Sequence, residues 1–438
     1  MSATSFAELG LRPELLRAVA EAGYTTPTPI QVQAIPVILA GKDVMGGAQT
    51  GTGKTAGFAL PILQKLAPMA NTSPSPARHP VRALILTPTR ELAVQVEESV
   101  RQYGKYTNLR STVVFGGVDI KQQLPIVRGG VEILVATPGR LLDHIEQKSV
   151  YLGQVEIFVL DEADRMLDMG FIDDIRFIAE CTPKTRQTMM YSATFAGNVG
   201  RLAAELLKPD AQNIAVTSHT DTHEHIEQRL HWADDGRHKQ ALLDHLLTTR
   251  EVDQALVFTS TQRDADWLAD RLADMGHAVA SLHGGLPQGR RNHVLQGLRS
   301  RKLRVLVATD VAARGIDVPT ISHVINFGLP MKAEDYVHRI GRTGRAGRQG
   351  LAVTLAEAAD AGMIRRIQQF TTQSIPVATI TGLEPKKAAP RTTGGGRSEG
   401  GFGSAKPFDR KPRFGAGPAG ARKPSGAFKS KRPSAFSR

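Results

Sequence analysis

The sequence has a single cysteine, few aromatic residues and no long apolar run. Cys181 alone cannot build a disulfide framework, and this usage suits a reducing cytosol. No apolar run reaches the ~18 residues that a membrane span needs. The first residues also lack the basic and apolar regions of a signal peptide. We therefore expect a cytoplasmic protein, and 438 residues are enough for two or three domains.

Positive charge is concentrated near the C-terminus. Of the formal net charge of +13, residues 385–438 contribute 14 Lys and Arg against two acidic residues, which leaves the rest of the chain at +1. Residues 384–438 are also rich in Gly, Pro, Ser and Ala, so the sequence predicts a disordered basic tail. Spaced phenylalanines could let this tail hold a single strand by stacking and phosphate attraction, although a merely solubilising tail is the alternative.

Short apolar runs alternate with helical patterns, which predicts two parallel α/β sheets. The first set of expected strands covers residues 81–87, 112–115, 133–136, 157–160 and 187–191. The second covers residues 255–258, 279–282, 305–308, 323–327 and 352–355. We therefore predict an N-terminal domain over residues 1–209, a polar linker over 210–227 and a C-terminal domain over 228–383, followed by the tail.

A phosphate-binding loop is the strongest signal in the first domain. It comprises Ala48, Gln49, Thr50, Gly51, Thr52, Gly53, Lys54 and Thr55. Glycines let backbone N–H groups approach phosphate oxygens, Lys54 should reach the β- and γ-phosphates, and Thr55 should ligate Mg²⁺. A glycine-rich turn without a ligand is the alternative, and Ala48 departs from the general pattern.

Two acidic residues end the apolar run 157–160, where ligands bind a parallel sheet. Asp161 can hold Mg²⁺ directly or through water, and Glu162 can orient or deprotonate the attacking water. The alternative is a solvated acidic helix start.

Residues 161–164 read Asp-Glu-Ala-Asp, and the chain resembles the DEAD-box ATP-dependent RNA helicases over residues 6 to 383. The opening stretch through Lys65 is most similar to the bacterial RhlE-like branch. In this family the loop carries Ala where Ala48 stands. The resemblance implies two tandem RecA-like parallel-sheet domains that use ATP and Mg²⁺ and act on RNA.

The segment from Gly23 to Gln31 resembles the adenine-reading Q motif of the family, with Phe6 as its upstream aromatic residue. A glutamine amide can accept a hydrogen bond from adenine N6 and donate one to N7, which guanine would leave mismatched. We therefore expect Gln31 to select ATP, Tyr24 to supply a stacking face and Phe6 to pack behind it.

The second domain carries Arg342 and Arg345 in a glycine-interrupted segment that we expect to expose them. A guanidinium beside the γ-phosphate is worth ~10³–10⁵ in rate for known arginine fingers. The resemblance implies that His338 bonds toward the acidic residues of the Asp-Glu-Ala-Asp motif and the attacking water. It also implies a nucleotide-binding role for Arg314 and Asp317, in which the aspartate contacts ribose. A solvated phosphate-binding loop is the alternative.

The resemblance also assigns residues that couple hydrolysis to RNA and residues that contact RNA. Ser192 and Thr194 are expected to couple ATP hydrolysis to domain closure and duplex opening, through hydrogen bonds from their hydroxyl groups to Asp164. The RNA contacts expected in the first domain follow strands: Pro88, Thr89, Arg90, Gly116, Gly117, Thr137, Pro138, Gly139 and Arg140. Those in the second domain are Thr259, Gln288, Arg291 and Thr309. Their chemistry suits phosphate and sugar contacts that tolerate any sequence, whether single-stranded or short duplex.

The sequence leaves open the choice between RNA and DNA, the exact activity and the partners. RNA and DNA cannot be told apart without the geometry of 2′-OH contacts, and only the family supplies RNA. The favoured activity is RNA-stimulated ATP hydrolysis for local duplex separation, against an ATP-dependent RNA clamp or scaffold with incidental turnover. Ribosomal precursors and the RNA-decay machinery are candidate partners.

Overall fold

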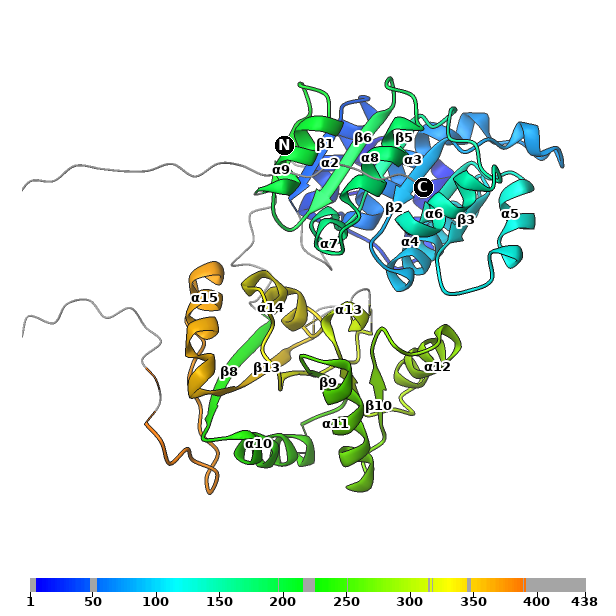
Figure 1. Cartoon of the computed structure of the whole chain (residues 1–438). Coiled ribbons are helices and arrows are strands. Elements are labelled where there is room, and N and C mark those ends of the chain that lie inside the picture. The colour runs from blue at the N-terminus through cyan, green and yellow to red at the C-terminus, as the bar shows by residue number, and fades with distance from the viewer. Residues whose placement is uncertain are drawn as a thin grey trace, which may run out of the picture. The chain divides into compact units, whose positions relative to one another are not determined.

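Two parallel sheets organise the chain. The computed structural model describes residues 5–47, 53–195, 197–215, 225–249, 251–313, 316, 318–344, 348–388 and 390. Helices lie on both faces of each sheet (Figure 1). The predicted α/β class with two parallel sheets is therefore confirmed.

Within the described residues the first sheet has seven strands in the order β3-β4-β2-β5-β6-β1-β7, and every pair is parallel. They are β1 Val44–Gly47, β2 Ala83–Leu86, β3 Ser111–Val114, β4 Ile133–Ala136, β5 Ile157–Leu160, β6 Gln187–Ser192 and β7 Gln212–Ala215. The helices are α1 Pro13–Glu21, α2 Pro29–Leu39, α3 Lys54–Leu66, α4 Arg90–Tyr103, α5 Leu124–Arg128, α6 Pro138–Glu146, α7 Ala163–Asp168, α8 Ile172–Glu180 and α9 Asn198–Leu206.

Side-chain alternation along β2 explains why both faces of this sheet are covered. Ala83 and Ile85 belong to a core with residues of α1 to α4, whereas Leu84 and Leu86 belong to a second core with residues of α6 to α9. Successive strand residues point to opposite faces, so a continuous apolar run is buried on both sides.

The second sheet has six strands among the described residues, in the order β10-β11-β9-β12-β13-β8, again all parallel. They are β8 Ile226–Ala233, β9 Ala255–Phe258, β10 Val279–Leu282, β11 Val305–Ala308, β12 His323–Asn326 and β13 Gly350–Glu357. The helices are α10 Gly236–Thr248, α11 Gln262–Asp274, α12 Gln288–Arg299, α13 Asp310–Ala313, α14 Ala333–Ile340 and α15 Ala361–Thr371.

Two predicted boundaries need correction. Residues 212–215, which the sequence assigns to the linker, form β7 and pair with β1, and β8 begins at Ile226 inside the same stretch. The predicted tail begins at residue 384, yet the backbone N–H groups of Lys386 and Lys387 donate to the Asp234 carboxylate, each at 2.9 Å. Residues 391–438 lie outside the described chain, so their predicted disorder stays a prediction.

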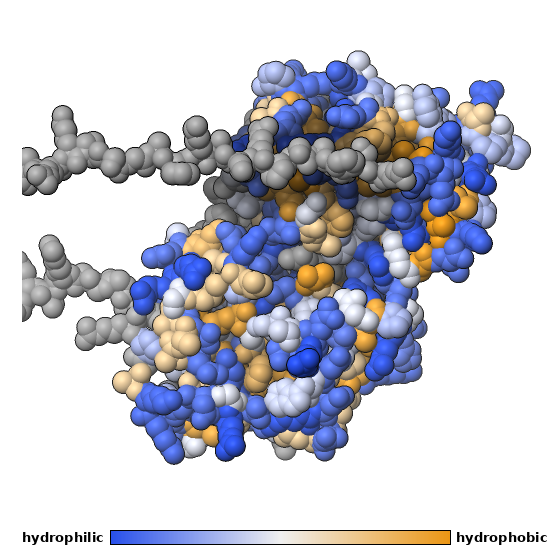
Figure 2. All heavy atoms as spheres, in the orientation of Figure 1, coloured by the Kyte–Doolittle hydropathy of each residue, from blue (hydrophilic) through white to orange (hydrophobic). Residues whose placement is uncertain are grey.

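One face of the molecule can be followed in Figure 2. On the face shown in Figure 2, hydrophilic residues predominate and apolar residues form small patches between them. Among the described residues, no helix combines the length and the apolar character that crossing a membrane would require.

Candidate functional site

Apart from the Q motif, which precedes β1, the predicted motifs of the first domain follow the carboxyl ends of strands and therefore lie along one edge of the sheet. The nucleotide motifs follow β1, β5 and β6, whereas the predicted RNA motifs follow β2, β3 and β4. In the sheet order these are two adjacent groups of three strands. Ligands of open parallel sheets bind at this edge, so it is divided into a nucleotide half and an RNA half.

Lys54 and two acidic residues form a buried cluster in the nucleotide half. Lys54 Nζ lies 2.9 Å from Asp161 Oδ1 and 3.9 Å from Glu162 Oε1. All three side chains are almost fully buried. Burial alone would lower the pKa of Lys54, but the neighbouring carboxylates of Asp161 and Glu162 outweigh it and raise that pKa. Lys54 therefore carries its positive charge at the end of the phosphate-binding loop.

Glu162 adopts a left-handed backbone conformation at the start of α7, with φ of 55°. Such a conformation is uncommon for a residue with a side chain and is found at functional sites where the surroundings enforce it. Its Oε1 atom is buried and accepts no hydrogen bond from any described residue. A buried carboxylate oxygen without a donor fits an acceptor for a water molecule or a metal-bound ligand.

The loop before α3 is only partly described. Ala48, Gln49, Thr50, Gly51 and Thr52 lie outside the described residues, and their phosphate contacts stay predictions. Gly53 has φ of 84°, and a Cβ atom there would lie 2.5 Å from Gln31 Nε2. Only glycine fits both this conformation and this close approach. Lys54 and Thr55 then begin α3 directly after it.

Gln31 connects the Q motif to this loop. Its Oε1 atom accepts from the Thr28 N–H group at 2.9 Å, and its Nε2 atom donates to the Gly53 carbonyl at 2.9 Å. Both ends of the amide are thus bonded to protein, and reading adenine requires these bonds to be exchanged. Tyr24 is 47% exposed and meets Tyr103 edge to face, so its ring is accessible for stacking. Phe6 is buried in the adjacent core, as expected for packing behind the motif.

The predicted coupling residues lie next to the acidic cluster. Burial raises the pKa of Asp164, while Arg165 and a hydrogen bond with Ser192 oppose the rise. The Ser192 hydroxyl also donates to the Thr194 carbonyl at 2.6 Å. The structure thus brings Ser192 to Asp164, and the coupling role itself stays a prediction.

The arginine segment of the second domain is held by α14. The expected exposure of Arg342 is wrong, because the side chain is 5% exposed and is bonded to the protein. It donates through Nε to the His338 carbonyl at 3.1 Å and through Nη1 to the Ile316 carbonyl at 3.0 Å. These bonds fix the direction of its guanidinium. Arg314, Asp317 and Arg345 lie outside the described residues.

Sequence reasoning missed Arg339, which anchors the same helix. It forms a bidentate pair with Asp310, at 2.6 and 2.7 Å, and also donates to the Asn326 side chain. Arg339 is 2% exposed. The helix pattern could not have shown this, because Arg339 lies outside the stripe of apolar residues on α14.

Cationic groups gather in the RNA half of the edge. Burial lowers the pKa of Arg90, and the neighbouring positive charges of Arg291 and Arg140 lower it further, against Glu91. Arg140 Nη1 is buried and has no hydrogen-bond partner among the described residues. Clustered guanidiniums with an unsatisfied donor fit a polyanion such as a phosphate backbone.

Backbone geometry supports this half of the site. Gly117 has φ of 84°, and a Cβ atom there would lie 2.1 Å from Arg90 Nη1, so glycine gives the guanidinium its space. Thr89 Oγ1 accepts from the Leu92 N–H group and caps α4. Thr137 precedes α6, which begins at Pro138, and Gly139 has open space around it. Pro88 and Gly116 lie in the same strand-end turns.

The second-domain RNA residues are mostly engaged with protein. Arg291 pairs with Glu91 through Nε and Nη2, at 2.9 and 2.6 Å, and donates to the His283 carbonyl. Gln288 Oε1 accepts from Arg90 Nη1 at 2.8 Å. In this structure Arg291 therefore positions α4 and α12, and its direct contact with RNA stays a prediction. Thr259 and Thr309 follow β9 and β11, as expected.

The motifs did not indicate two ion pairs, Glu91 with Arg291 and Arg165 with Asp335. Arg165 on α7 forms a hydrogen-bonded ion pair with Asp335 on α14. Arg165 is 3% exposed, and the carboxylate of Asp335 contributes to a raised pKa of the guanidinium, against burial. Both pairs join residues at least 170 positions apart, so no local pattern could have found them.

These features define an α/β protein with a buried lysine and carboxylate cluster for a nucleoside triphosphate and an adjacent cationic surface for a polyanion. A family model described as DEAD/DEAH box helicase matches residues 28–202, and one described as Helicase conserved C-terminal domain matches residues 238–347. The chain is 43% identical over 390 residues to the ATP-dependent RNA helicase SrmB of Escherichia coli, covering 89% of this chain and 87% of that protein.

Two further relatives agree. The RNA helicase CrhR of Synechocystis is 42% identical over 377 residues, with 86% of this chain and 75% of that protein covered. The structure of Dbp5 of S. cerevisiae bound to RNA and ADP BeF3 superposes with a TM-score of 0.76 at 32% identity, covering 86% of this chain and 96% of that chain.

The chain belongs to the DEAD-box ATP-dependent RNA helicases. It is thus an ATP-hydrolysing, RNA-binding enzyme, and the predicted pair of RecA-like domains is confirmed. The RhlE-like branch stays a prediction.

Proposed function

We propose that RNA stimulates ATP hydrolysis by this enzyme, and that hydrolysis drives local separation of short RNA duplexes or remodelling of RNA–protein complexes. The observation that supports this most is the division of one sheet edge into adjacent nucleotide and RNA halves. Ligands in adjacent halves can influence one another because β2 and β5, at the border of the two halves, are neighbours in the sheet. We place this activity in the cytoplasm, with ribosomal precursors or the RNA-decay machinery as candidate partners.

The residues around Lys54 suit magnesium and a triphosphate. Thr55 and Asp161 would hold Mg²⁺, which supplies positive charge that neutralises phosphate oxygens. Lys54 exchanges its bond to Asp161 for phosphate oxygens. Glu162 Oε1, which has no donor among the described residues, accepts a hydrogen bond from the attacking water and orients it.

Arginines of the second domain complete the reaction centre. A guanidinium beside the γ-phosphate neutralises the charge that develops on the transferred group. Since Arg342 is directed by bonds to the backbone of its own domain, its approach depends on where that domain lies. RNA that binds both domains favours the arrangement in which hydrolysis is fast, by a shift of population.

The first test compares nucleic acids as activators. Steady-state ATPase rates are measured without nucleic acid, with single-stranded RNA and with DNA of the same sequence. We expect RNA to raise the rate and DNA to have little effect. Equal rates in all three conditions contradict the proposal, and equal stimulation by DNA shows that the enzyme does not select RNA. A strand-separation assay on a short RNA duplex distinguishes a helicase from a clamp with incidental turnover.

A second test concerns the basic tail. Residues 391–438 are deleted, which keeps Lys386 and Lys387 on Asp234. We expect RNA affinity to fall and its salt dependence to become shallower, because phosphate contacts release counterions. The ATPase rate at saturating RNA should stay the same. An unchanged slope of log affinity against log salt contradicts a role of the tail in binding.

A further inference from the structure

Charged side chains also gather at the other edge of the first sheet, where the strands begin. Arg82, Glu156 and Arg186 each occupy the position directly before a strand, namely β2, β5 and β6. These strands are neighbours in the sheet. None of the nucleotide or RNA motifs lies at this amino edge, so its charges are not explained by the site described above.

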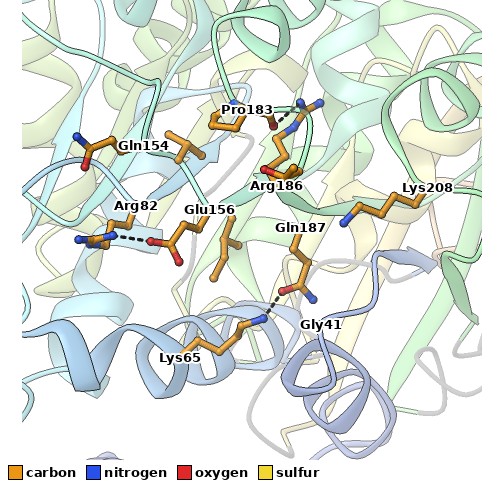
Figure 3. Close-up of a pocket in the computed structure, with 12 residues that line it drawn as sticks. Gly41, Lys65, Arg82, Gln154, Glu156, Pro183, Arg186, Gln187 and Lys208 are labelled. Atoms are coloured by element: carbon orange, nitrogen blue, oxygen red, sulfur yellow. Dashed lines mark hydrogen bonds and ion pairs between the residues drawn. The ribbon is translucent and has the colours of Figure 1, made fainter.

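An open pocket of about 520 Å³ lies at this edge. In Figure 3 four cationic side chains surround it: Lys65, Arg82, Arg186 and Lys208. Lys65 extends from the end of α3, and Lys208 precedes β7. The centre holds Glu156 and Gln187 (Figure 3).

A second pocket, of about 730 Å³, continues the first. The two share Arg82 and Gln154, and the second adds Arg78 together with polar side chains such as Asn71 and Thr72. We call the two pockets together the amino-edge groove, defined by Lys65, Arg78, Arg82, Gln154, Glu156, Arg186 and Lys208. Most of its lining side chains are polar, and no Phe, Tyr or Trp lines it.

Positive charge in the groove exceeds negative charge. Five Lys and Arg residues face one lining carboxylate, Glu156, which pairs with Arg82 at 2.5 Å. Asp43 lies behind Lys208, 3.8 Å from its Nζ, and it is bonded by the N–H groups of Thr188 and Lys208. Residues 1–384 as a whole carry a net charge of only +1, so the excess is local.

Two of the cations, Lys65 and Arg186, have neutral hydrogen-bond partners. Lys65 Nζ donates to Gln187 Oε1 at 2.7 Å, and Arg186 Nη1 donates to the carbonyls of Ala179 and Pro183. Arg186 is 9% exposed, and its Nε atom has no hydrogen-bond partner among the described residues. Burial lowers the pKa of Lys65, and Lys208 lowers it further, against Glu156. A bound anion would relieve the charge excess.

We propose that the amino-edge groove binds the phosphate backbone of an RNA segment that flanks the segment held at the carboxyl edge. This inference rests on the proposed function. Lys, Arg, hydroxyl and amide groups are the side chains that contact phosphate and sugar. The lack of aromatic residues excludes base stacking, so the contact is independent of sequence. Cations in two adjoining pockets fit a polymer with repeated phosphates better than a single small anion, and only RNA long enough to reach both edges uses them.

The test uses the full chain with two charges removed from the groove, Lys65→Gln with Lys208→Gln. The matched control is Arg365→Gln with Arg366→Gln, which removes two exposed charges from α15. Each protein is titrated with a short single strand and with a stem that carries a single-stranded extension, at several salt concentrations. Unfolding temperatures verify folding, and Arg78→Gln, an exposed position, provides a second groove variant.

We expect the groove variant to bind the long RNA several-fold more weakly, and the slope of log affinity against log salt to fall by about 1.4, the value for two single-strand phosphate contacts at about 0.7 each. Binding of the short strand and its stimulation of the ATPase should not change. A groove variant that matches the control on long RNA overturns the inference. So does a polyglutamate peptide that binds through Lys65 and Lys208 while long RNA binding is unaffected, since the occupant is then an acidic protein partner.

These outcomes separate the inference from the proposed function. If the short strand stimulates the wild-type ATPase while the groove variant matches the control, only the groove is contradicted. If no RNA stimulates the wild type, the proposed function itself fails.

Discussion

Replacing Glu162 with glutamine is expected to lower kcat for RNA-stimulated ATP hydrolysis by ~10²–10⁴, the contribution of a positioned general base. The amide has nearly the same shape, so the left-handed backbone at this position is kept. The glutamine amide cannot accept a proton from the water. It also carries no negative charge where the wild-type carboxylate has an oxygen without a hydrogen-bond donor. Affinity for ATP should be equal or higher, because a negative charge beside the phosphates has been removed.

Steady-state ATPase rates at saturating RNA check this, together with nucleotide binding measured by fluorescence. Glu180→Gln, an exposed position at the end of α8, is the matched control and should behave as the wild type. Retention of full turnover by Glu162→Gln would show that another group prepares the water.

Replacing Arg342 with alanine is expected to lower kcat by ~10³–10⁵, the range measured for arginine fingers. The reason is electrostatic, since the guanidinium stabilises charge that exists only in the transition state, so kcat should fall much more than affinity for ATP. RNA should stimulate the residual rate much less, because closure then brings one guanidinium fewer to the γ-phosphate.

The control must account for the structural bonds of Arg342 to the His338 and Ile316 carbonyls. Unfolding temperature and RNA affinity are therefore measured on the same variant. Arg299→Ala, an exposed arginine at the end of α12, removes one charge from the same domain and should leave kcat unchanged. A rate for Arg342→Ala within a few-fold of the wild type contradicts a role at the phosphates.

Strands with strongly apolar runs could be predicted from sequence, and those without could not. Residues 133–136, 157–160, 255–258, 279–282 and 305–308 form strands with the predicted bounds. β1 was missed because it ends in two glycines, which have low strand preference. β7 and β8 were missed because polar residues interrupt them, and their burial depends on neighbours that the local pattern does not show.

The nucleotide site was also accessible from sequence, because its chemistry sits in short contiguous motifs. Lys54, Asp161 and Glu162 are brought together as expected, since parallel strands end at one edge. Contacts between distant residues were not accessible. Glu91 with Arg291 and Arg165 with Asp335 are ion pairs whose partners are chosen by the fold, and surface charge patterns alone fit many partners. For the same reason the sequence predicts an RNA contact for Arg291, whereas the structure pairs it with the Glu91 carboxylate.

The central claim is that Lys54 from one domain and Arg342 from the other act on the same triphosphate. A crystal structure of the enzyme with single-stranded RNA and a non-hydrolysable ATP analogue tests this most directly. The account predicts the Arg342 guanidinium within about 2.7–2.9 Å of a γ-phosphate oxygen, the distance of a charge-assisted hydrogen bond, with Lys54 on the β- and γ-phosphates. A structure in which Arg342 keeps only its carbonyl bonds and faces away from the nucleotide contradicts it.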